Sequence, residues 1–290
     1  MGDDSHRFNG VYSNNFYEYG TALSNKYLSN DGTSWLTYTE NSGTMTCTGL
    51  SSTATDTDIR IASYVNGKVV TGIGNGAFQN RNKLTSVAIP NNVTSIGNSA
   101  FNGCSSLTSM AIPDSVTSIR KQAFALCPGL TNVTIGNGAL SIGDSAFSYC
   151  MGLTNLVIGN GTKSIGQSAF NLCTSLTSIT IPNSVTLIQS SAFSDCRGLE
   201  SVTIPDSVTE IRRVIFNKCS KLTSIKYLGT IKAFKKMFTN TQYHENGYGE
   251  NTLGNNIPDT LVIYCTDGQI AKDGTVILYY VNPTIIRRWN

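Results

Sequence analysis

SAFNGCSSLTSMAIP, residues 99–113, is one of a series of similar stretches that recur along the chain. Its phenylalanine recurs seven times at one constant spacing, that of Phe78 and Phe101, and six of the seven have a cysteine at the third following place. Leucine and isoleucine columns repeat in the same register, from Leu84 to Leu222 and from Ile73 to Ile211. Four columns with one period establish an internal repeat. The columns of phenylalanine and cysteine comprise Phe78, Phe101, Phe124, Phe147, Phe170, Phe193 and Phe216, and Cys104, Cys127, Cys150, Cys173, Cys196 and Cys219.

Each unit contains one segment typical of a strand and one typical of a short helical turn. The segment LTSVAIP (84–90) alternates apolar and polar residues, as a half-buried strand does, and a proline or glycine then ends it. In SAFNGC (99–104), Phe101 and Cys104 stand three places apart, which suits one helical turn. A single unit is too small to bury its own apolar face, so neighbouring units must stack into a solenoid. We expect the phenylalanines to form a ladder of rings inside that stack.

The cysteine column predicts buried free thiols. Its members stand a whole repeat apart and form no paired C-x-x-C motif, so a zinc site is not indicated. Cysteines on successive coils would point in the same direction, which does not suit the facing geometry of a disulfide. We therefore interpret them as small apolar residues of the core. Cys47 and Cys265 would lie at opposite ends of a rod, too far apart to pair.

We divide the chain into four parts. Residues 1–33 form an N-terminal extension that we expect to be partly disordered. Residues 34–72 form an N-terminal cap with an irregular first coil, residues 73–227 form the 23-residue repeats, and residues 228–290 form a C-terminal cap of helix, loop and strands. Non-repeating caps are expected because the terminal coils of a solenoid would otherwise expose their core.

Short patterns predict the elements of the two caps. We expect a hairpin with its turn near residues 41–43, and an irregular first coil in which Ile59 and Ile61 match Val87 and Ile89, with an insertion at 64–68. In the C-terminal cap we expect a helix over 229–240 with Thr230 as its N-cap, and a loop over 241–259. Two closing strands follow, with turns predicted at Asp267–Gly268 and Asp273–Gly274.

Composition and charge exclude several classes of protein. The 290 residues carry a net charge of only +3, which does not suggest nucleic-acid binding, and no apolar run is long enough to span a bilayer. The first ten residues, MGDDSHRFNG, have no secretory signal pattern, so for an exported protein we expect the signal to have been removed. The only histidines are His6 and His244, and neither has neighbours of a catalytic or metal-binding pattern. We expect no catalytic residue, metal or cofactor.

The units resemble the BspA-like leucine-rich repeats, also called the Treponema pallidum type. LTSVAIPNNVTSIGNSAFNGC (84–104) follows that family's unit almost throughout, and the cap segments around 55–78 and 227–270 are also similar to the ends of such proteins. The resemblance implies a curved, right-handed solenoid with parallel strands on its concave face and short helical turns on its convex side. It also implies a bacterial or protist protein at the cell surface or secreted, in a family that includes adhesins. No binding residue can be carried over, because the family motif contains none.

Two surfaces are candidates for binding. The first is the concave strand face, whose outward residues are small and nearly uncharged: Ser109, Asn132, Thr134, Asn155, Ser178, Thr180, Ser201 and Thr203. A solvated strand face without a ligand is the alternative interpretation. The second is a basic patch near the C-terminal end, formed by Arg212, Arg213, Lys232, Lys235 and Lys236. It suits an acidic glycan or protein, or alternatively serves only to keep the cap soluble.

The sequence favours a non-catalytic, adhesin-like binding protein whose partner is an extracellular protein or glycan. The alternative is a passive spacer or stalk with no ligand of its own. Ice binding through a hydroxyl ladder is a weaker alternative, because the outward columns mix Ser, Asn, Ala and Val. No nucleic acid and no membrane insertion are expected, and the sequence predicts neither the partner's identity nor the oligomeric state.

Overall fold

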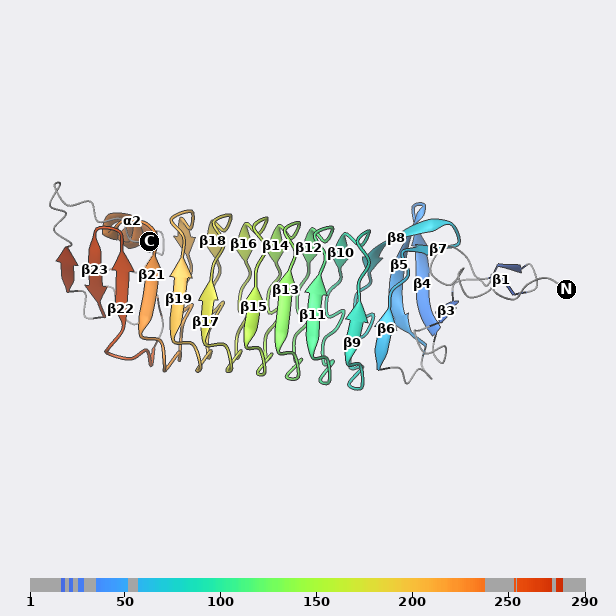
Figure 1. The fold of residues 1–290 in the computed structure, drawn as a ribbon, viewed down its shortest axis with the longest axis horizontal. Helices are drawn as coiled ribbons and strands as arrows, with labels where there is room; N and C mark the ends of the chain where they lie inside the picture. The colour runs from blue at the N-terminus through green and yellow to red at the C-terminus, as the bar shows by residue number, and fades with distance from the viewer. Residues whose placement is uncertain are drawn as a thin grey trace, which may run out of the picture.

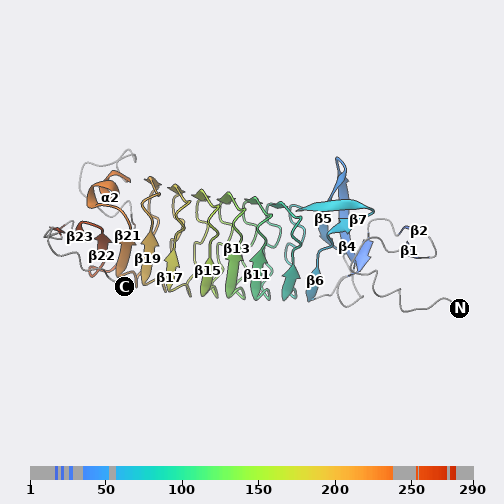
Figure 2. The same ribbon diagram turned by 45° about the horizontal axis from the view of Figure 1, so that its top comes forward.

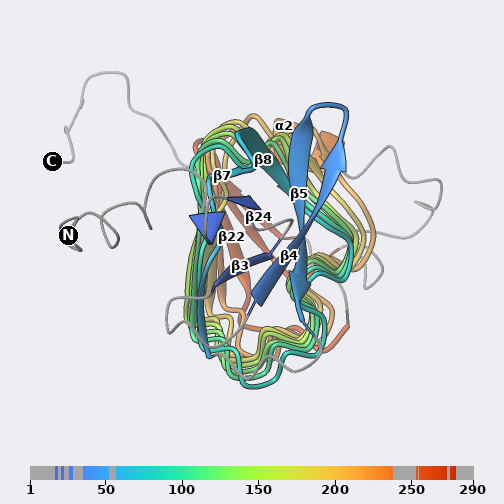
Figure 3. The same cartoon turned by 90° about the vertical axis from the view of Figure 1, so that its right-hand side faces the viewer.

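The chain folds into a β-solenoid whose coils stack in single file (Figure 1). The computed structural model describes residues 35–51, 57–237, 255–272 and 275–278, together with Leu253 and three short strands nearer the N-terminus. These strands are β1 (Tyr17–Glu18), β2 (Thr21–Ala22) and β3 (Lys26–Leu28). Viewed along the long axis, the coils overlay in one outline (Figure 3). The predicted solenoid is therefore confirmed, whereas the expected disorder of residues 1–33 falls, apart from β1 to β3, outside the described residues.

Each coil contributes a strand to a first column on one face of the solenoid. Where neighbouring repeat strands of this column pair, they do so in parallel and one repeat apart, as Ser109 with Asn132 and Asn132 with Asn155. The predicted match of Ile59 with Val87 is also confirmed. The first column consists of β6 (Asp58–Arg60), β9 (Ser86–Ala88), β11 (Ser109–Ile112), β13 (Asn132–Ile135), β15 (Asn155–Val157), β17 (Ser178–Thr180), β19 (Ser201–Ile204) and β21 (Ser224–Tyr227).

A second strand column, which sequence reasoning missed, lies on another side of each coil (Figure 2). Most of its strands are only two residues long, and their isoleucines pair across coils in parallel, as Ile119 with Ile142. A pair of residues between two turns carries too little alternation to be recognised as a strand. The second column consists of β8 (Lys68–Ile73), β10 (Ser95–Ile96), β12 (Ser118–Ile119), β14 (Ser141–Ile142), β16 (Ser164–Ile165), β18 (Leu187–Ile188) and β20 (Glu210–Ile211).

The segment around each phenylalanine forms successive turns and no α-helix. In residues 99–104, the amides of Asn102 and Cys104 donate to carbonyls three residues earlier, but the amides of Ser99, Phe101 and Gly103 donate to the next coil. Since every second amide bonds to a neighbouring coil, it is not available for the helical ladder. The predicted helical turn thus keeps its three-residue spacing but not its helical hydrogen bonds.

The phenylalanine ladder is confirmed. The rings from Phe78 to Phe216 are fully buried and stacked, with centroids of successive rings 5.0 to 5.9 Å apart. The six repeat cysteines are fully buried beside them as free thiols, as predicted. Burying each ring contributes about 1.5 to 3 kcal/mol to folding. The core is therefore one continuous column running along the solenoid.

The N-terminal cap contains the predicted hairpin. Strand β4 (Trp35–Asn41) pairs antiparallel with β5 (Thr44–Leu50) around Ser42 and Gly43, which have φ angles of 46° and 84°. Strand β5 then joins the second column through β8. The predicted insertion forms a smaller hairpin, in which β7 (Tyr64–Val65) pairs with the start of β8.

The C-terminal cap closes the other end. Helix α2 (Ile231–Met237) is capped as predicted, because the Thr230 hydroxyl accepts a hydrogen bond from the amide of Ala233, at 3.2 Å. Strands β22 (Val262–Cys265), β23 (Gly268–Ala271) and β24 (Val276–Leu278) extend the first column beyond β21. The turn predicted at Asp267–Gly268 is wrong by one residue.

That turn consists of Thr266 and Asp267, since Cys265 pairs directly with Gly268. The carboxylate of Asp267 is thereby free to accept a hydrogen bond from the amide of Ile231, at the start of α2. The other predicted turn, Asp273–Gly274, and residues 241–252 of the predicted loop lie outside the described residues. The boundaries at residues 33, 72 and 227 stay predictions.

Candidate functional site

The outward side chains of the first strand column form two parallel rows along the solenoid. They lie outward because successive residues of a strand point to opposite faces, and the intervening residues fill the core. Of the predicted candidates, Ser109, Asn132, Thr134, Asn155, Ser178 and Thr180 are exposed, and Ser201 and Thr203 are half-buried. A binding role for these residues stays a prediction.

The rows are not continuous, although the repeat predicts that they should be. The first column is divided into three sheets, β6–β9, β11–β13–β15, and β17 onward. Asn155 and Ser178 consequently belong to different sheets, even though they occupy equivalent positions of neighbouring units. The eight candidates are thus divided into two groups of four.

The second row, which contains Thr134, Thr180 and Thr203, extends beyond the repeats at both ends. At the N-terminal end, Arg60 pairs with Ala88 and is exposed. At the C-terminal end, Thr203 pairs with Lys226, and Lys226 pairs with Tyr264, whose side chain is 40% exposed. Sequence reasoning found no Tyr or Arg on this face. The alternation in LVIYC (261–265), with Ile263 buried, was the signal that could have placed Tyr264 outward.

Threonines immediately before the strands use their hydroxyl groups within the solenoid. Thr108, Thr131 and Thr154 each donate a hydrogen bond to the carbonyl of the equivalent residue in the preceding coil, at 3.0 to 3.3 Å. These hydroxyls connect successive coils, so they hold the rows beside them at a constant spacing. The side-chain amide of Asn132 donates in turn to the hydroxyl of Thr131.

The predicted basic patch lies at the C-terminal end of the array, on the residues that directly follow β20 and on α2. Arg212, Arg213, Lys232 and Lys236 are exposed, and Lys235 is half-buried. Arg212 forms an ion pair with Glu210, at 2.6 Å. This pairing partly neutralises the positive charge that Arg212 presents to a partner. Figures 1 and 2 place α2 beside this end of the array.

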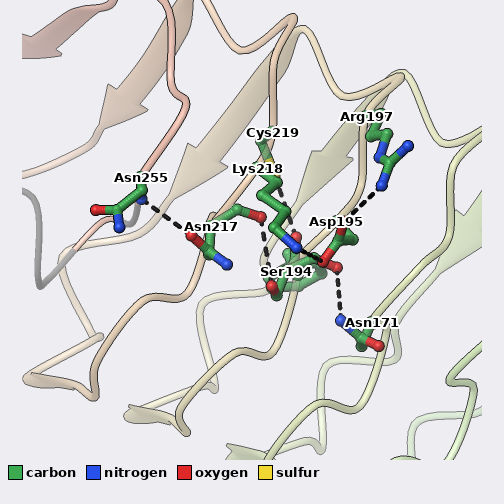
Figure 4. A network of polar contacts seen from close by, with 9 residues as sticks. Asn171, Ser194, Asp195, Arg197, Asn217, Lys218, Cys219 and Asn255 are labelled. Atoms are coloured by element: carbon green, nitrogen blue, oxygen red, sulfur yellow. Dashed lines mark hydrogen bonds and ion pairs between the residues drawn. The ribbon is translucent and has the colours of Figure 1, made fainter.

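A polar network lies on the turns of the last repeat coils (Figure 4). Asp195 forms ion pairs with Arg197, at 3.1 Å, and with Lys218, at 3.7 Å. The Asn217 side chain accepts a hydrogen bond from the amide of Asn255, at 3.0 Å. Because the carbonyls of Leu253 and Asn255 also accept hydrogen bonds from amides of the last repeat coil, this network connects the array to its C-terminal cap.

The described residues contain no group of three or more His, Cys, Asp or Glu side chains that could hold a metal ion. The two histidines, His6 and His244, lie outside the described part of the chain. Burial raises the pKa of the Cys104 and Cys127 thiols to about 12, so these cysteines are poor nucleophiles. No helix in the part of the chain that the structure describes is long and apolar enough to cross a membrane.

The family model described as "BspA type Leucine rich repeat region" matches residues 71–158 and 140–257, in six copies. The chain belongs to this family. The BspA-type array is also similar to the leucine-rich repeat protein of T. pallidum, at 26% identity and a TM-score of 0.60, over 64% of this chain and 87% of that one. No curated protein sequence matches it significantly.

Two further solved structures align with this BspA-type chain. A leucine-rich repeat protein from Bacteroides ovatus has 27% identity and a TM-score of 0.46, over 67% of this chain and 64% of that one. A leucine rich cell surface protein from Faecalibacterium prausnitzii has 24% identity and a TM-score of 0.37, over 70% and 84%.

Proposed function

We propose that this BspA-type chain is a non-catalytic binding module, displayed at the cell surface or secreted, that binds an extracellular protein or glycan along the outward rows of its first strand column. Membership of the family supports the surface placement. The observation that carries the binding proposal is the second row, because small uncharged residues there lead directly to Lys226 and the exposed ring of Tyr264. Tyrosine is among the residues that dominate binding energy at interfaces.

The centre and the C-terminal end of this row differ in what they can contribute to binding. The central positions, such as Thr134 and Thr180, provide a flat surface on which a partner can lie without a steric or charge penalty. Lys226 supplies a positive charge, and the ring of Tyr264 supplies apolar area with a polar hydroxyl. A partner with an acidic group near an aromatic or sugar ring fits this end.

The test is a surface-binding panel of extracellular matrix proteins and glycans, comparing the native chain with the variant Tyr264→Ala. We expect a ligand with a dissociation constant of tens of micromolar or lower, and a loss of roughly tenfold in affinity for the variant. Tyr64→Ala is the matched control, because Tyr64 is 48% exposed but lies on the small hairpin away from the row. It should bind like the native chain.

Equal losses for the two variants would contradict the assignment to this row. A passive spacer is the second candidate, and the uncharged, flat centre of the face favours it. An absence of binding across the panel at tens of micromolar would support the spacer.

A further inference from the structure

An apolar stripe crosses the turns in the middle of the array, on a side away from the strand rows. It consists of Leu126, Tyr149 and Leu172, which occupy one position of three successive coils, two residues after the buried phenylalanine. Leu126 is 48% exposed, Tyr149 is 44% exposed, and Leu172 is half-buried. Beside the stripe lies Met151, which is 44% exposed. The three turn segments 124–130, 147–153 and 170–176 contain no charged residue.

The backbone at this position is unfavourable for these side chains. Leu126, Tyr149 and Leu172 have φ angles of 59°, 63° and 61°, in the left-handed region that Gly, Asn and Asp tolerate best. The array requires this conformation, because the amide of each residue donates to a carbonyl of the next coil, at 2.8 to 2.9 Å. Three of the other four coils place Asn80, Gly103 and Asp195 there, as this backbone favours.

The stripe is therefore costly to the isolated chain in two ways, in its backbone and in the apolar surface that it leaves in water. Packing within the array does not compensate, since the side chains of Leu126 and Tyr149 remain about half exposed. Exposed apolar patches, especially those containing Tyr and Met, are typical of protein interfaces.

The order of residues along the stripe is symmetric about Tyr149. The rings of Phe124 and Phe170 stack on Phe147 with centroid distances of 5.0 and 5.4 Å, so Leu126 and Leu172 lie about one coil to either side of Tyr149. A twofold axis through Tyr149, perpendicular to the solenoid, places each Leu126 opposite Leu172 of a second copy. An interface between identical chains requires such a self-complementary surface.

The charges beyond Leu172 in the same column favour the antiparallel arrangement of the two solenoids. Asp195 and the exposed Lys218 would lie opposite Gly103 and Asn80 of the second copy, which carry no charge. In a parallel arrangement Asp195 and Lys218 would each lie opposite the same residue of the second copy, and the like charges would repel.

We propose that the stripe of Leu126, Tyr149 and Leu172 is a self-association surface, on which a second copy of this chain docks antiparallel about a twofold axis at Tyr149. Because the stripe is much smaller than the roughly 800 Å² per partner of a standard interface, the dimer is weak. We expect a dissociation constant of roughly 10 to 100 µM.

Sedimentation velocity over a concentration series tests this proposal. The native chain should shift from monomer to dimer as its concentration rises through the dissociation constant, and Tyr149→Lys should weaken the dimer at least about tenfold. The column itself accommodates lysine, since Lys218 occupies the equivalent position with a φ of 60°. Leu140→Lys is the matched control, because Leu140 is 55% exposed but lies outside the stripe. A native chain that stays monomeric, or an unchanged dimer in Tyr149→Lys, would overturn the proposal.

Cross-linking tests the register and does not depend on the folding of the lysine variant. All eight native cysteines are buried, so an added surface cysteine provides the accessible thiol. Under mild oxidation, a mixture of the Leu126→Cys and Leu172→Cys chains should form a disulfide-linked dimer, whereas neither chain should cross-link alone. Cross-linking of each variant with itself would overturn the antiparallel arrangement. Failure of the mixture to cross-link, at concentrations where the native chain dimerises, would overturn the assignment of the stripe as the dimer interface.

Discussion

The cysteine column has a more specific role than filling space. Each of the six thiols donates a hydrogen bond to the carbonyl of the phenylalanine in the preceding coil, at 3.1 to 3.4 Å, as Cys127 does to Phe101. A thiol is small enough to pack beside a ring and still provides a weak donor for a buried carbonyl. Alanine would fill most of the space but would remove this hydrogen bond and leave the carbonyl with the one that it accepts from its own coil, as Phe101 does from the amide of Cys104.

We predict that alkaline pH destabilises the fold through these thiols. Burial raises the pKa of Cys104 and Cys127 from 9.0 to about 12, so between these values the unfolded chain releases protons that the folded chain retains. Stability is fully present below about pH 9 and falls as the pH rises towards 12, by about 1.4 kcal/mol per pH unit for each thiol. Chemical denaturation at a series of pH values measures how steeply the free energy of unfolding falls with pH. This fall should be less steep in Cys127→Ala, because that variant lacks the contribution of one thiol. Identical slopes would contradict the prediction.

We predict that Phe147→Ala lowers the free energy of unfolding by about 3 to 5 kcal/mol. Phe147 is fully buried between two neighbouring rings, so removing it leaves a cavity in the middle of the ladder. Thermal or urea unfolding measures the loss, and Phe147→Leu, which preserves most of the volume, should lose less. A melting temperature of Phe147→Ala equal to that of the native chain would refute the buried ladder.

Among the elements, the first coil shows why a repeat must change where the array begins. Arg81 occupies the place of the repeat cysteine, and its guanidinium donates to the carbonyls of Leu50 and Ser51, at 2.9 and 3.1 Å. No repeat coil precedes this one, so there is no phenylalanine carbonyl for a thiol to reach. The longer side chain instead attaches the coil to the end of the N-terminal hairpin.

We predict that Arg81→Cys destabilises the N-terminal cap, although it completes the cysteine column of the sequence. Two hydrogen bonds to β5 and the residue after it are lost, at a cost of about 1 to 3 kcal/mol. Hydrogen exchange of the amides of β4 and β5 measures the loosening, with Cys104→Ala as the control that alters the next coil instead. Greater protection of these amides in Arg81→Cys would contradict the prediction. It would show that a cysteine at this position stabilises the cap more than the two hydrogen bonds of Arg81 do.

For the whole molecule, stability is shared between neighbouring coils, because each coil bonds only to the coils beside it. The parallel register between neighbouring repeat coils is always one whole repeat, as Ser95 with Ser118 and Ser118 with Ser141 show. Any repeat coil can therefore take the position of its neighbour without changing the register of the strands.

We predict that deletion of one whole repeat, residues 147–169, leaves a folded solenoid with a lower melting temperature. After the deletion Phe170 takes the place of Phe147, so every column stays in register. A deletion one residue shorter is the control, since it moves the apolar residues of the following strands to the outer face. Circular dichroism and thermal unfolding compare the two. Equal stability of both deletions would contradict the fixed register.

The sequence by itself determined the core, the register between the repeat coils and the main elements of the caps. A constant period places the same residue type at the same point of each coil, so the ladder from Phe78 to Phe216 follows from spacing alone. The pairing of Ile59 with Val87 follows from the alternation that the irregular first coil shares with the repeats. The cap residue Thr230 was also predictable, because N-capping depends on a local pattern.

Only the tertiary structure decided how the backbone hydrogen bonds are shared between coils. The short second column, the turn amides that bond to the next coil, and the interruption between β15 and β17 all depend on that sharing, and the side-chain pattern of a unit does not encode it. The surfaces follow from the same cause. Tyr264 enters the outward row because β22 pairs with β21. Leu126, Tyr149 and Leu172 become a strained, partly exposed stripe because the turns adopt a left-handed backbone.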